Sequence, residues 1–330
     1  MITNLEVKNF KSIKHLKLDC KRINIFIGEP NTGKSNILEA LGIFSFGGYG
    51  NKRETTLDRW IRFESMSNLF YDENLEESVN ISLDNKILNI RYVKGAFEAT
   101  CVEQRPTGDA INIFNFTYDY AGHGSAGFSR ATSIRFYRFA IKGVFPGKEP
   151  EYLLPPSGDN LLAILRARKD LRNTIGGIFK GYGLRLLLEP QEGKMKLQKE
   201  YDEILISYPY QLISDTLQRV IFHLAAIDSN RESVIAFEEP ESHSFPYYTK
   251  YLAERIALDE NKNQYFITTH NPYLLFSILE KAPKEDVGIF ITYFEDYQTK
   301  VKELSEGEKE EIMELEMDIF FNIRRFLEKG

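Results

Sequence analysis

Eight consecutive residues constrain the fold of this chain more than any other feature of its sequence. Residues 28–35 read Gly-Glu-Pro-Asn-Thr-Gly-Lys-Ser and match the phosphate-binding pattern G-x-x-x-x-G-K-[ST] at every fixed position. The apolar run Ile23–Ile27 precedes the motif, and a helical pattern follows it from Lys34 to about Phe44. A strand, a glycine-rich turn and a helix in this order predict an α/β fold of the P-loop NTPase type.

The chemistry of this motif predicts a nucleotide site. Backbone N–H groups of the turn and the positive end of the following helix are expected to bind phosphates. Lys34 should reach the β- and γ-phosphates, and the Ser35 hydroxyl should ligate Mg²⁺. We therefore predict that the chain binds ATP with Mg²⁺. The candidate nucleotide-binding residues of the motif are Gly28, Asn31, Thr32, Gly33, Lys34, Ser35 and Asn36.

Two later segments carry candidate catalytic groups. The apolar run Val234–Phe237 leads directly into Glu238 and Glu239. In a P-loop fold the first acid is expected to face the metal, usually through water, and the second to act as general base. Adjacent acids can also be a solvated charge cluster, but a complete P-loop favours the catalytic interpretation. His270 ends the next predicted strand, where it would sense the γ-phosphate, although a lone histidine is often purely structural.

The rest of the chain divides into segments of different character. Residues 50–150 contain short alternating runs between turn residues, which predict an antiparallel lobe inserted into the nucleotide fold. From Leu212 strands and helices alternate again, which predicts a mostly parallel sheet flanked by helices. Specific expectations are strands at Val79–Leu83, Ile87–Val93 and Ile134–Phe139, a mobile glycine-rich loop at Tyr118–Ser129, a helix at Asn160–Leu171, and an amphipathic helical tail from Ser305 to Gly330.

These segments predict a domain organisation. Residues 1–48 are expected to be the N-terminal part of an ATPase domain, and residues 49–210 an inserted β lobe with a small helical insertion. Residues 211–300 are expected to complete the ATPase domain, and residues 301–330 to form the helical tail.

Composition excludes several classes of protein. No apolar run is long enough to cross a bilayer and no cleavable leader is recognisable, so we expect a cytoplasmic protein with no membrane partner. Cys20 and Cys101 are too few for a disulfide framework or a cysteine zinc site. The net charge of −6 argues against a uniformly basic nucleic-acid-binding protein.

Two local basic clusters remain possible nucleic-acid surfaces. A solvated face is the commoner meaning of such clusters and is the alternative for each. The first contains Arg130, Arg135, Arg138 and Lys142, and the second Arg166, Arg168, Lys169 and Arg172.

The motifs together resemble a known class of ATPase. Residues 2–13 and the P-loop ending at Asn36 resemble ABC-type ATPase heads of the RecF/SMC type. Residues 237–243, Phe-Glu-Glu-Pro-Glu-Ser-His, are similar to the OLD (overcoming lysogenisation defect) family, and residues 154–161 also look like a segment of its stand-alone ATP-binding members. Unlike SMC proteins and OLD nucleases, this sequence has no long heptad region and no recognisable Toprim acid cluster. We therefore do not assign nuclease activity to this chain.

The resemblance implies a paired mechanism. In this class two heads enclose two ATP molecules, and each head contacts the other's nucleotide through a signature serine at a helix start. The best match is Ser214, at the start of an apolar helix running to about Ile227, although Asp215 replaces the usual glycine. The resemblance thus implies a homodimer, with a separate effector protein and DNA or RNA as further partners.

Three functions follow from these features. The first is an ATPase that drives a partner protein or a nucleic-acid transaction such as DNA repair or anti-phage defence. The second is a nucleotide-gated binding module with little hydrolysis, which Glu238 in place of the commoner aspartate favours. The third, a P-loop small-molecule kinase, does not account for Glu239 and His270. If Glu239 is not the base, Glu241 is the next candidate.

Overall fold

The sheet that carries the P-loop is formed by segments from both halves of the chain. The computed structural model describes residues 1–50, 56–314 and 319–328. Its six-stranded sheet has the order β16-β15-β3-β14-β13-β9, in which every neighbouring pair is parallel except β15 and β16. The strands are β3 (Ile23–Gly28), β9 (Ile134–Tyr137), β13 (Val234–Glu238), β14 (Gln264–Thr268), β15 (Val287–Glu295) and β16 (Gln298–Glu303). The central strands β3 and β14 are buried along their whole length, which explains why most of their residues are apolar.

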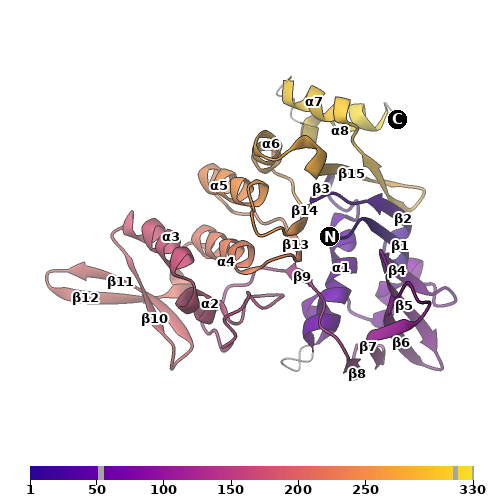
Figure 1. Cartoon of the computed structure of the whole chain (residues 1–330), viewed down its shortest axis with the longest axis horizontal. Helices are drawn as coiled ribbons and strands as arrows, with labels where there is room; N and C mark the ends of the chain where they lie inside the picture. The colour runs from indigo at the N-terminus through magenta and orange to yellow at the C-terminus, as the bar shows by residue number, and fades with distance from the viewer. Residues whose placement is uncertain (51–55, 315–318, 329–330) are drawn as a thin grey trace.

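Helices cover both faces of this sheet (Figure 1). On one face lie α4 (Asp215–Ser229), α5 (Pro246–Ala257) and α6 (Pro272–Lys281), and on the other lies α1 (Lys34–Tyr49). Helix α1 is buried on nearly all sides because a second sheet packs on its far side. This explains why the helix after the P-loop is apolar around its circumference instead of amphipathic.

The second sheet is antiparallel, as expected of the lobe. Its order is β2-β1-β4-β5-β6-β7-β8. Strand β1 pairs with both β2 and β4, so the N-terminal strands belong to the same sheet as the lobe. The strands are β1 (Asn4–Phe10), β2 (Ile13–Asp19), β4 (Val79–Leu83), β5 (Lys86–Val93), β6 (Ala96–Gln104), β7 (Ala110–Tyr118) and β8 (Gly124–Phe128). The prediction of a mostly parallel sheet is therefore confirmed only for the P-loop sheet.

Three local predictions differ from the structure in part. The glycine-rich stretch Tyr118–Ser129 is not simply a loop, because β8 pairs with β7 and Phe128 packs its ring 5.4 Å from that of Phe46. The strand expected at Ile134–Phe139 exists as β9, but it pairs with β13 in the P-loop sheet and not with the lobe. The helix expected at Asn160–Leu171 is divided at Arg168, whose extended backbone separates α2 (Leu161–Ala167) from α3 (Lys169–Lys180).

The remaining elements lie at the ends of the molecule. A three-stranded sheet that the sequence did not reveal, β10 (Arg185–Glu189), β11 (Lys194–Tyr201) and β12 (Ile204–Pro209), projects beside α2 and α3 (Figure 1). The tail forms α7 (Glu306–Glu314) and α8 (Ile319–Leu327). Its apolar residues Ile312, Ile319, Ile323 and Phe326 are buried in the chain's own core, and Leu315 lies outside the described residues.

Short 3-10 helices complete the described structure. They are η2 (Leu57–Arg59), η3 (Met66–Leu69), η4 (Tyr71–Glu73), η5 (Tyr210–Leu212) and η6 (Lys284–Asp286). Within the described ranges, no helix combines the length and apolarity that crossing a bilayer requires.

Candidate nucleotide-binding site

The P-loop joins β3 to α1 through two glycines with positive φ. Gly28 has φ 154° and Gly33 has φ 88°, and Asn31 between them is also left-handed at φ 63°. A Cβ on Gly33 would lie 2.0 Å from Thr299 Oγ1, and one on Gly28 would lie 2.3 Å from the Thr292 carbonyl oxygen. Both glycines are therefore required by backbone conformation and by the close approach of the β15–β16 hairpin.

Lys34 is the central cation of the loop. It is 5% exposed, and its Nζ donates to the carbonyl oxygens of Gly28, at 2.9 Å, and Glu29, at 2.8 Å. Burial lowers the pKa of Lys34 to about 8, and the Glu239 carboxylate opposes this shift. Because a buried ammonium prefers an anionic partner, this position suits a nucleotide phosphate.

Hydroxyl groups from the hairpin and the β1–β2 turn support the loop. Thr32 Oγ1 lies 2.7 Å from Thr292 Oγ1 and donates to the Glu29 carbonyl at 2.8 Å. On the other side, Ser12 Oγ lies 2.6 Å from Thr299 Oγ1 and accepts from Asn36 Nδ2 at 2.7 Å. Of the predicted site residues, Thr32 and Asn36 therefore hold the loop through their side chains. Sequence analysis did not identify the hairpin threonines, because their contacts join segments far apart in the chain.

The carboxyl ends of three neighbouring strands bring the other predicted residues together. Glu238 ends β13 in register with Thr268 of β14, and Thr268 is in turn in register with Phe26 of β3. His270 Nε2 lies 3.5 Å from Glu239 Oε1. The pKa of His270 is lowered by partial burial and by the Lys34 cation, against the opposing effect of Glu239. The P-loop lysine, the second acid and the histidine thus lie within electrostatic reach of one another.

A charged cluster surrounds the first acid. Glu238 accepts from Arg62 at 3.0 Å and lies 3.4 Å from Arg138 Nε. Both arginines also bind Glu39, a fully buried carboxylate of α1, at 2.8 and 3.1 Å, and Lys11 contacts the same carboxylate. Three cations therefore share two carboxylates here. The signal that could have revealed this cluster is Glu39 itself, an acid between the apolar residues Leu38 and Ala40 of α1.

The donor set at this edge fits a magnesium ion. The Ser35 hydroxyl and the Glu238 carboxylate offer hard oxygen ligands, which Mg²⁺ prefers. Among the described residues, no group of three or more His, Cys, Asp or Glu side chains could hold a metal alone. This agrees with the usual protein site for Mg²⁺, in which one or two side chains and the substrate phosphates share the ion with water.

Ser214 lies apart from this group. It is exposed at the start of α4, where its hydroxyl accepts from the Leu217 N–H at 3.4 Å. Within the described part of the chain it makes no hydrogen bond to the P-loop. The start of α4 is nevertheless connected to the site, because Thr216 Oγ1 donates to the His243 carbonyl at 2.6 Å, in the loop that follows Glu239.

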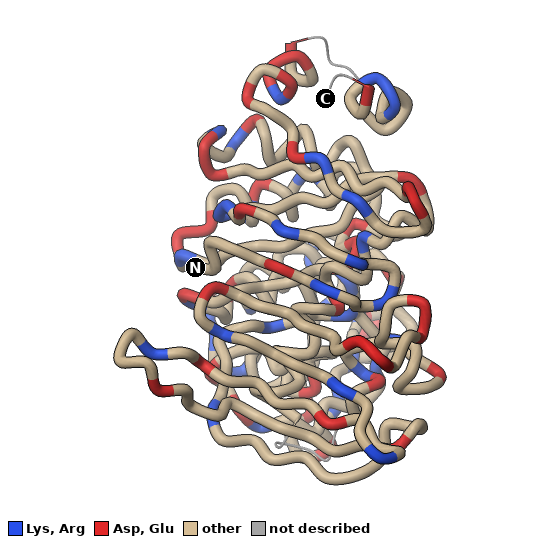
Figure 2. The backbone as a smooth tube through the Cα atoms, turned by 90° about the vertical axis from the view of Figure 1, so that its right-hand side faces the viewer, with Lys and Arg blue, Asp and Glu red and all other residues tan. Residues whose placement is uncertain are grey.

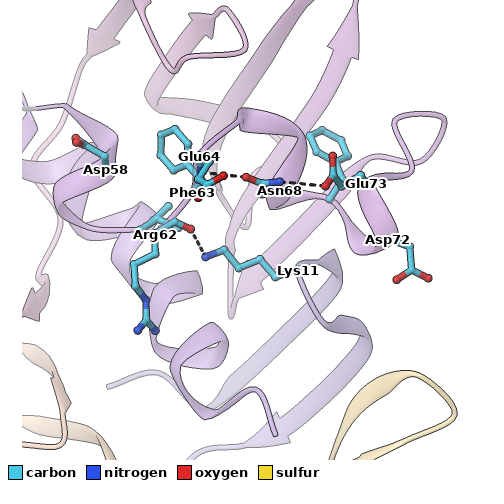
Figure 3. Close-up of a pocket in the computed structure, with 10 residues that line it drawn as sticks. Lys11, Asp58, Arg62, Phe63, Glu64, Asn68, Asp72 and Glu73 are labelled. Carbon is cyan, nitrogen blue, oxygen red and sulfur yellow. Dashed lines mark hydrogen bonds between the residues drawn. The ribbon is translucent and has the colours of Figure 1, made fainter. Parts of the chain in front are cut away.

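A hollow of about 680 Å³ lies next to the charged cluster (Figure 3). Lys11 extends along it and donates to the Arg62 carbonyl oxygen at 2.6 Å. Two phenylalanines and four carboxylates contribute to its lining, namely Phe63, Phe70, Asp58, Glu64, Asp72 and Glu73. Lys11, which lines the hollow, is followed in the chain by Ser12, whose hydroxyl accepts from Asn36 in the first turn of α1.

Most of the basic residues considered as nucleic-acid contacts are engaged within the chain. Arg135 stacks on Tyr152 at 3.7 Å, Arg130 pairs with Glu103 at 2.8 Å, and Lys142 pairs with Asp159. In the second cluster the Arg168 and Arg172 guanidinium groups donate to backbone carbonyls. On the side of the antiparallel sheet, residues of both charge signs are mixed along the described chain (Figure 2).

Comparisons with known proteins cover most of the chain. Residues 1–143 match the family model of the AAA ATPase domain, and residues 141–275 match a model described as AAA domain, putative AbiEii toxin, Type IV TA system. An ATP/GTP phosphatase of Helicobacter pylori is 36% identical over 138 residues, which are 36% of this chain and 36% of the relative. The DNA replication and repair protein RecF of Clostridium novyi is 26% identical over 117 residues, which are 34% of this chain and 31% of the relative. The matches span less than half the length of these curated relatives.

The fold itself is that of an SMC head. The Smc head domain bound to the C-terminal domain of ScpA from Pyrococcus furiosus superposes with a TM-score of 0.54 at 14% identity, covering 95% of this chain and 98% of that one. An SMC head bound to the C-winged helix domain of ScpA gives a TM-score of 0.53 at 16% identity, covering 94% and 99%. Taken together, the two consecutive family models, the RecF relative and the head fold support the assignment of this chain as an ABC-type ATPase head of the RecF/SMC class.

Proposed function

We propose that this chain hydrolyses ATP in the presence of Mg²⁺, with Glu239 as general base. The convergence of Lys34, Glu239 and His270 at one sheet edge carries this proposal: His270 lies 3.5 Å from Glu239, and the charges of Lys34 and Glu239 both act on the pKa of His270. A buried lysine in a glycine loop binds phosphate, and an acid beside a histidine can act on the phosphate and the attacking water.

Each residue then has a distinct role. The Glu239 carboxylate, which is 42% exposed, takes a proton from water as the water oxygen attacks the γ-phosphorus. The bond from the γ-phosphorus to the bridging oxygen breaks and ADP leaves, while Lys34 neutralises the charge that develops on the β- and γ-phosphates. His270 contacts the γ-phosphate. Ser35 and Glu238 would hold Mg²⁺, whose contribution is to offset phosphate charge.

The side of the γ-phosphate that faces away from the P-loop requires donors from another source. We propose that Ser214 of a second copy supplies them in an ATP-dependent, two-fold symmetric homodimer. The exposure of Ser214 at a helix start supports this role, because a hydroxyl and free N–H groups there suit an anion. The hollow beside Lys11 is our candidate for the base and ribose, since two phenylalanines line it.

Light scattering tests the homodimer. The Glu239→Gln variant, which should retain ATP, is expected to double in mass when Mg²⁺ and ATP are added. Combining it with Ser214→Arg should prevent the doubling while leaving ATP binding largely intact. A Glu239→Gln chain that stays monomeric at all concentrations with ATP rejects the homodimer, and equal dimerisation without ATP makes assembly constitutive.

One observation favours the alternative of a nucleotide-gated binding module with little hydrolysis. Glu238 is engaged by Arg62 and Arg138, so ion pairs compete with metal binding at this carboxylate. Steady-state phosphate release, with and without DNA, separates the two functions. Turnover that depends on Glu239 supports the ATPase, whereas tight ATP binding without turnover supports the module.

The partner on which the ATPase acts also belongs to this proposal. An effector protein or a nucleic acid is the expected partner, in a process such as DNA repair or anti-phage defence, and we propose a cytoplasmic location. The similarity to RecF and to the AbiEii-like model supports this expectation at the level of the class. Co-purification from the native source would identify the partner.

A further inference from the structure

A second acid near the site is not used by the proposed reaction. Glu241, three residues after Glu238, is 5% exposed, whereas Glu239 is 42% exposed at its side chain. A carboxylate without a charged partner is costly to bury, so this position requires an explanation. Burial raises the pKa of Glu241 to about 7, and the Thr269 hydroxyl and backbone N–H groups oppose that shift.

The contacts of Glu241 lie on the segment that carries His270. Its Oε1 accepts from the Thr269 hydroxyl and, at 3.4 Å, from the His270 backbone N–H. The Thr269 oxygen in turn accepts from the Asn271 N–H at 2.9 Å, and Asn271 caps the start of α6. One carboxyl oxygen therefore organises the whole turn from Thr269 to Asn271.

The loop that carries Glu241 also carries Glu239, the proposed general base, and contacts α4, the helix that begins after Ser214. Ser242 Oγ donates to Glu239 Oε2 at 3.1 Å, and the Glu239 N–H donates to the Thr268 carbonyl at 3.1 Å. The next residue, His243, accepts from Thr216 near the start of α4. One loop, which Glu241 anchors to the end of β14, therefore determines the positions of Glu239, His270 and the start of α4.

We propose that Glu241 is a positioning residue for His270, acting as a buried hydrogen-bond acceptor that holds the Thr269–His270 turn so that the imidazole faces Glu239. This inference rests on the proposed hydrolysis. Glu241 Oε2 has no hydrogen-bond partner among the described residues, so only Oε1 makes the hydrogen bonds that hold the turn. Glutamine, which keeps one acceptor oxygen, should therefore replace glutamate here, whereas alanine should not.

Two pairs of variants test this role. Glu241→Ala and Thr269→Val remove the acceptor and its donor, and each should lower kcat roughly tenfold or more while ATP affinity stays within about twofold. Glu241→Gln and Thr269→Ser keep the hydrogen bond and should retain kcat within about threefold. Thr249→Val is the matched control, because Thr249 is a fully buried threonine of α5 whose hydroxyl has no partner in the described structure. It should leave kcat unchanged.

A spectroscopic readout separates positioning from stability and does not depend on turnover. The His270 ring, followed by NMR, titrates in the field of Lys34 and Glu239, whose effect depends on where the ring lies. Its titration midpoint should move in Glu241→Ala and Thr269→Val but not in Glu241→Gln or Thr249→Val.

The outcomes of these experiments are distinct. Loss of turnover in Glu241→Gln as large as in Glu241→Ala would overturn the proposal and make Glu241 an acid or base. Unchanged kcat and an unchanged His270 titration in both Glu241→Ala and Thr269→Val would also overturn it. A wild-type chain without turnover would instead reject the proposed hydrolysis, and the His270 titration would still decide the role of Glu241.

Discussion

Neutralising Glu39 should destabilise the fold more than neutralising any surface acid. This carboxylate is fully buried and binds Lys11, Arg62 and Arg138, whose side chains are 12%, 58% and 27% exposed. Removing one partner of a buried ion pair costs about 3–5 kcal/mol, because the remaining charge stays uncompensated. Arg62 can turn toward water, so we expect the lower end, about 3 kcal/mol, for Glu39→Gln.

Urea denaturation measures this loss as a decrease in the free energy of unfolding. The matched control is Glu98→Gln, which breaks the pair with Arg91 on the lobe surface, where the side chains are 37% and 61% exposed. Such an exposed pair contributes about 0–1 kcal/mol. Equal losses in Glu39→Gln and Glu98→Gln would refute the reasoning, because burial would then not decide the energy of the cluster.

Three further predictions concern the P-loop and the acidic loop. Lys34→Ala should weaken ATP binding at least tenfold, about 1.4 kcal/mol by titration calorimetry, and wild-type affinity in a folded variant would contradict the P-loop assignment. Gly33→Ala should destabilise the chain by more than about 1 kcal/mol, because Gly33 has φ 88° and an added Cβ would clash with Thr299 and Ser12. Gly176→Ala should instead stabilise the chain by about 0.5–1 kcal/mol, because Gly176 lies in helix α3 and an added Cβ there would meet nothing within 4 Å. Burial raises the pKa of Glu241 from 4.5 to about 7, so between these pH values the native state keeps a proton that the unfolded state releases. The free energy of unfolding should therefore decrease as pH rises from 4.5 to about 7, and urea denaturation of Glu241→Gln should show no such decrease.

The local parts of the site could be predicted from the sequence. The P-loop is contiguous, and parallel strands end at the same edge, so Lys34, Glu238 and His270 could be expected to meet. The cap of α4 by Ser214 also follows from local chemistry, since a serine before an apolar helical pattern is a good N-cap.

The parts that depend on long-range packing could not be predicted. Arg62 and Glu238 are separated by 176 residues, and no local pattern links them. The place of β9 in the P-loop sheet and the pairing of β1 with β4 likewise depend on which strands meet in space. Arg62 was therefore not identified from the sequence, and Arg138 was considered only as part of a basic surface, whereas the structure gives Arg138 two carboxylate partners.

The most direct test of ATP hydrolysis at this site compares the wild-type chain with Glu239→Gln. Phosphate release with saturating Mg²⁺ and ATP is measured alongside ATP affinity for both proteins. We predict equal affinity and turnover reduced roughly a hundredfold or more in the variant, since the lost group is a general base. Unchanged turnover in Glu239→Gln would contradict the central claim and move the base to another residue.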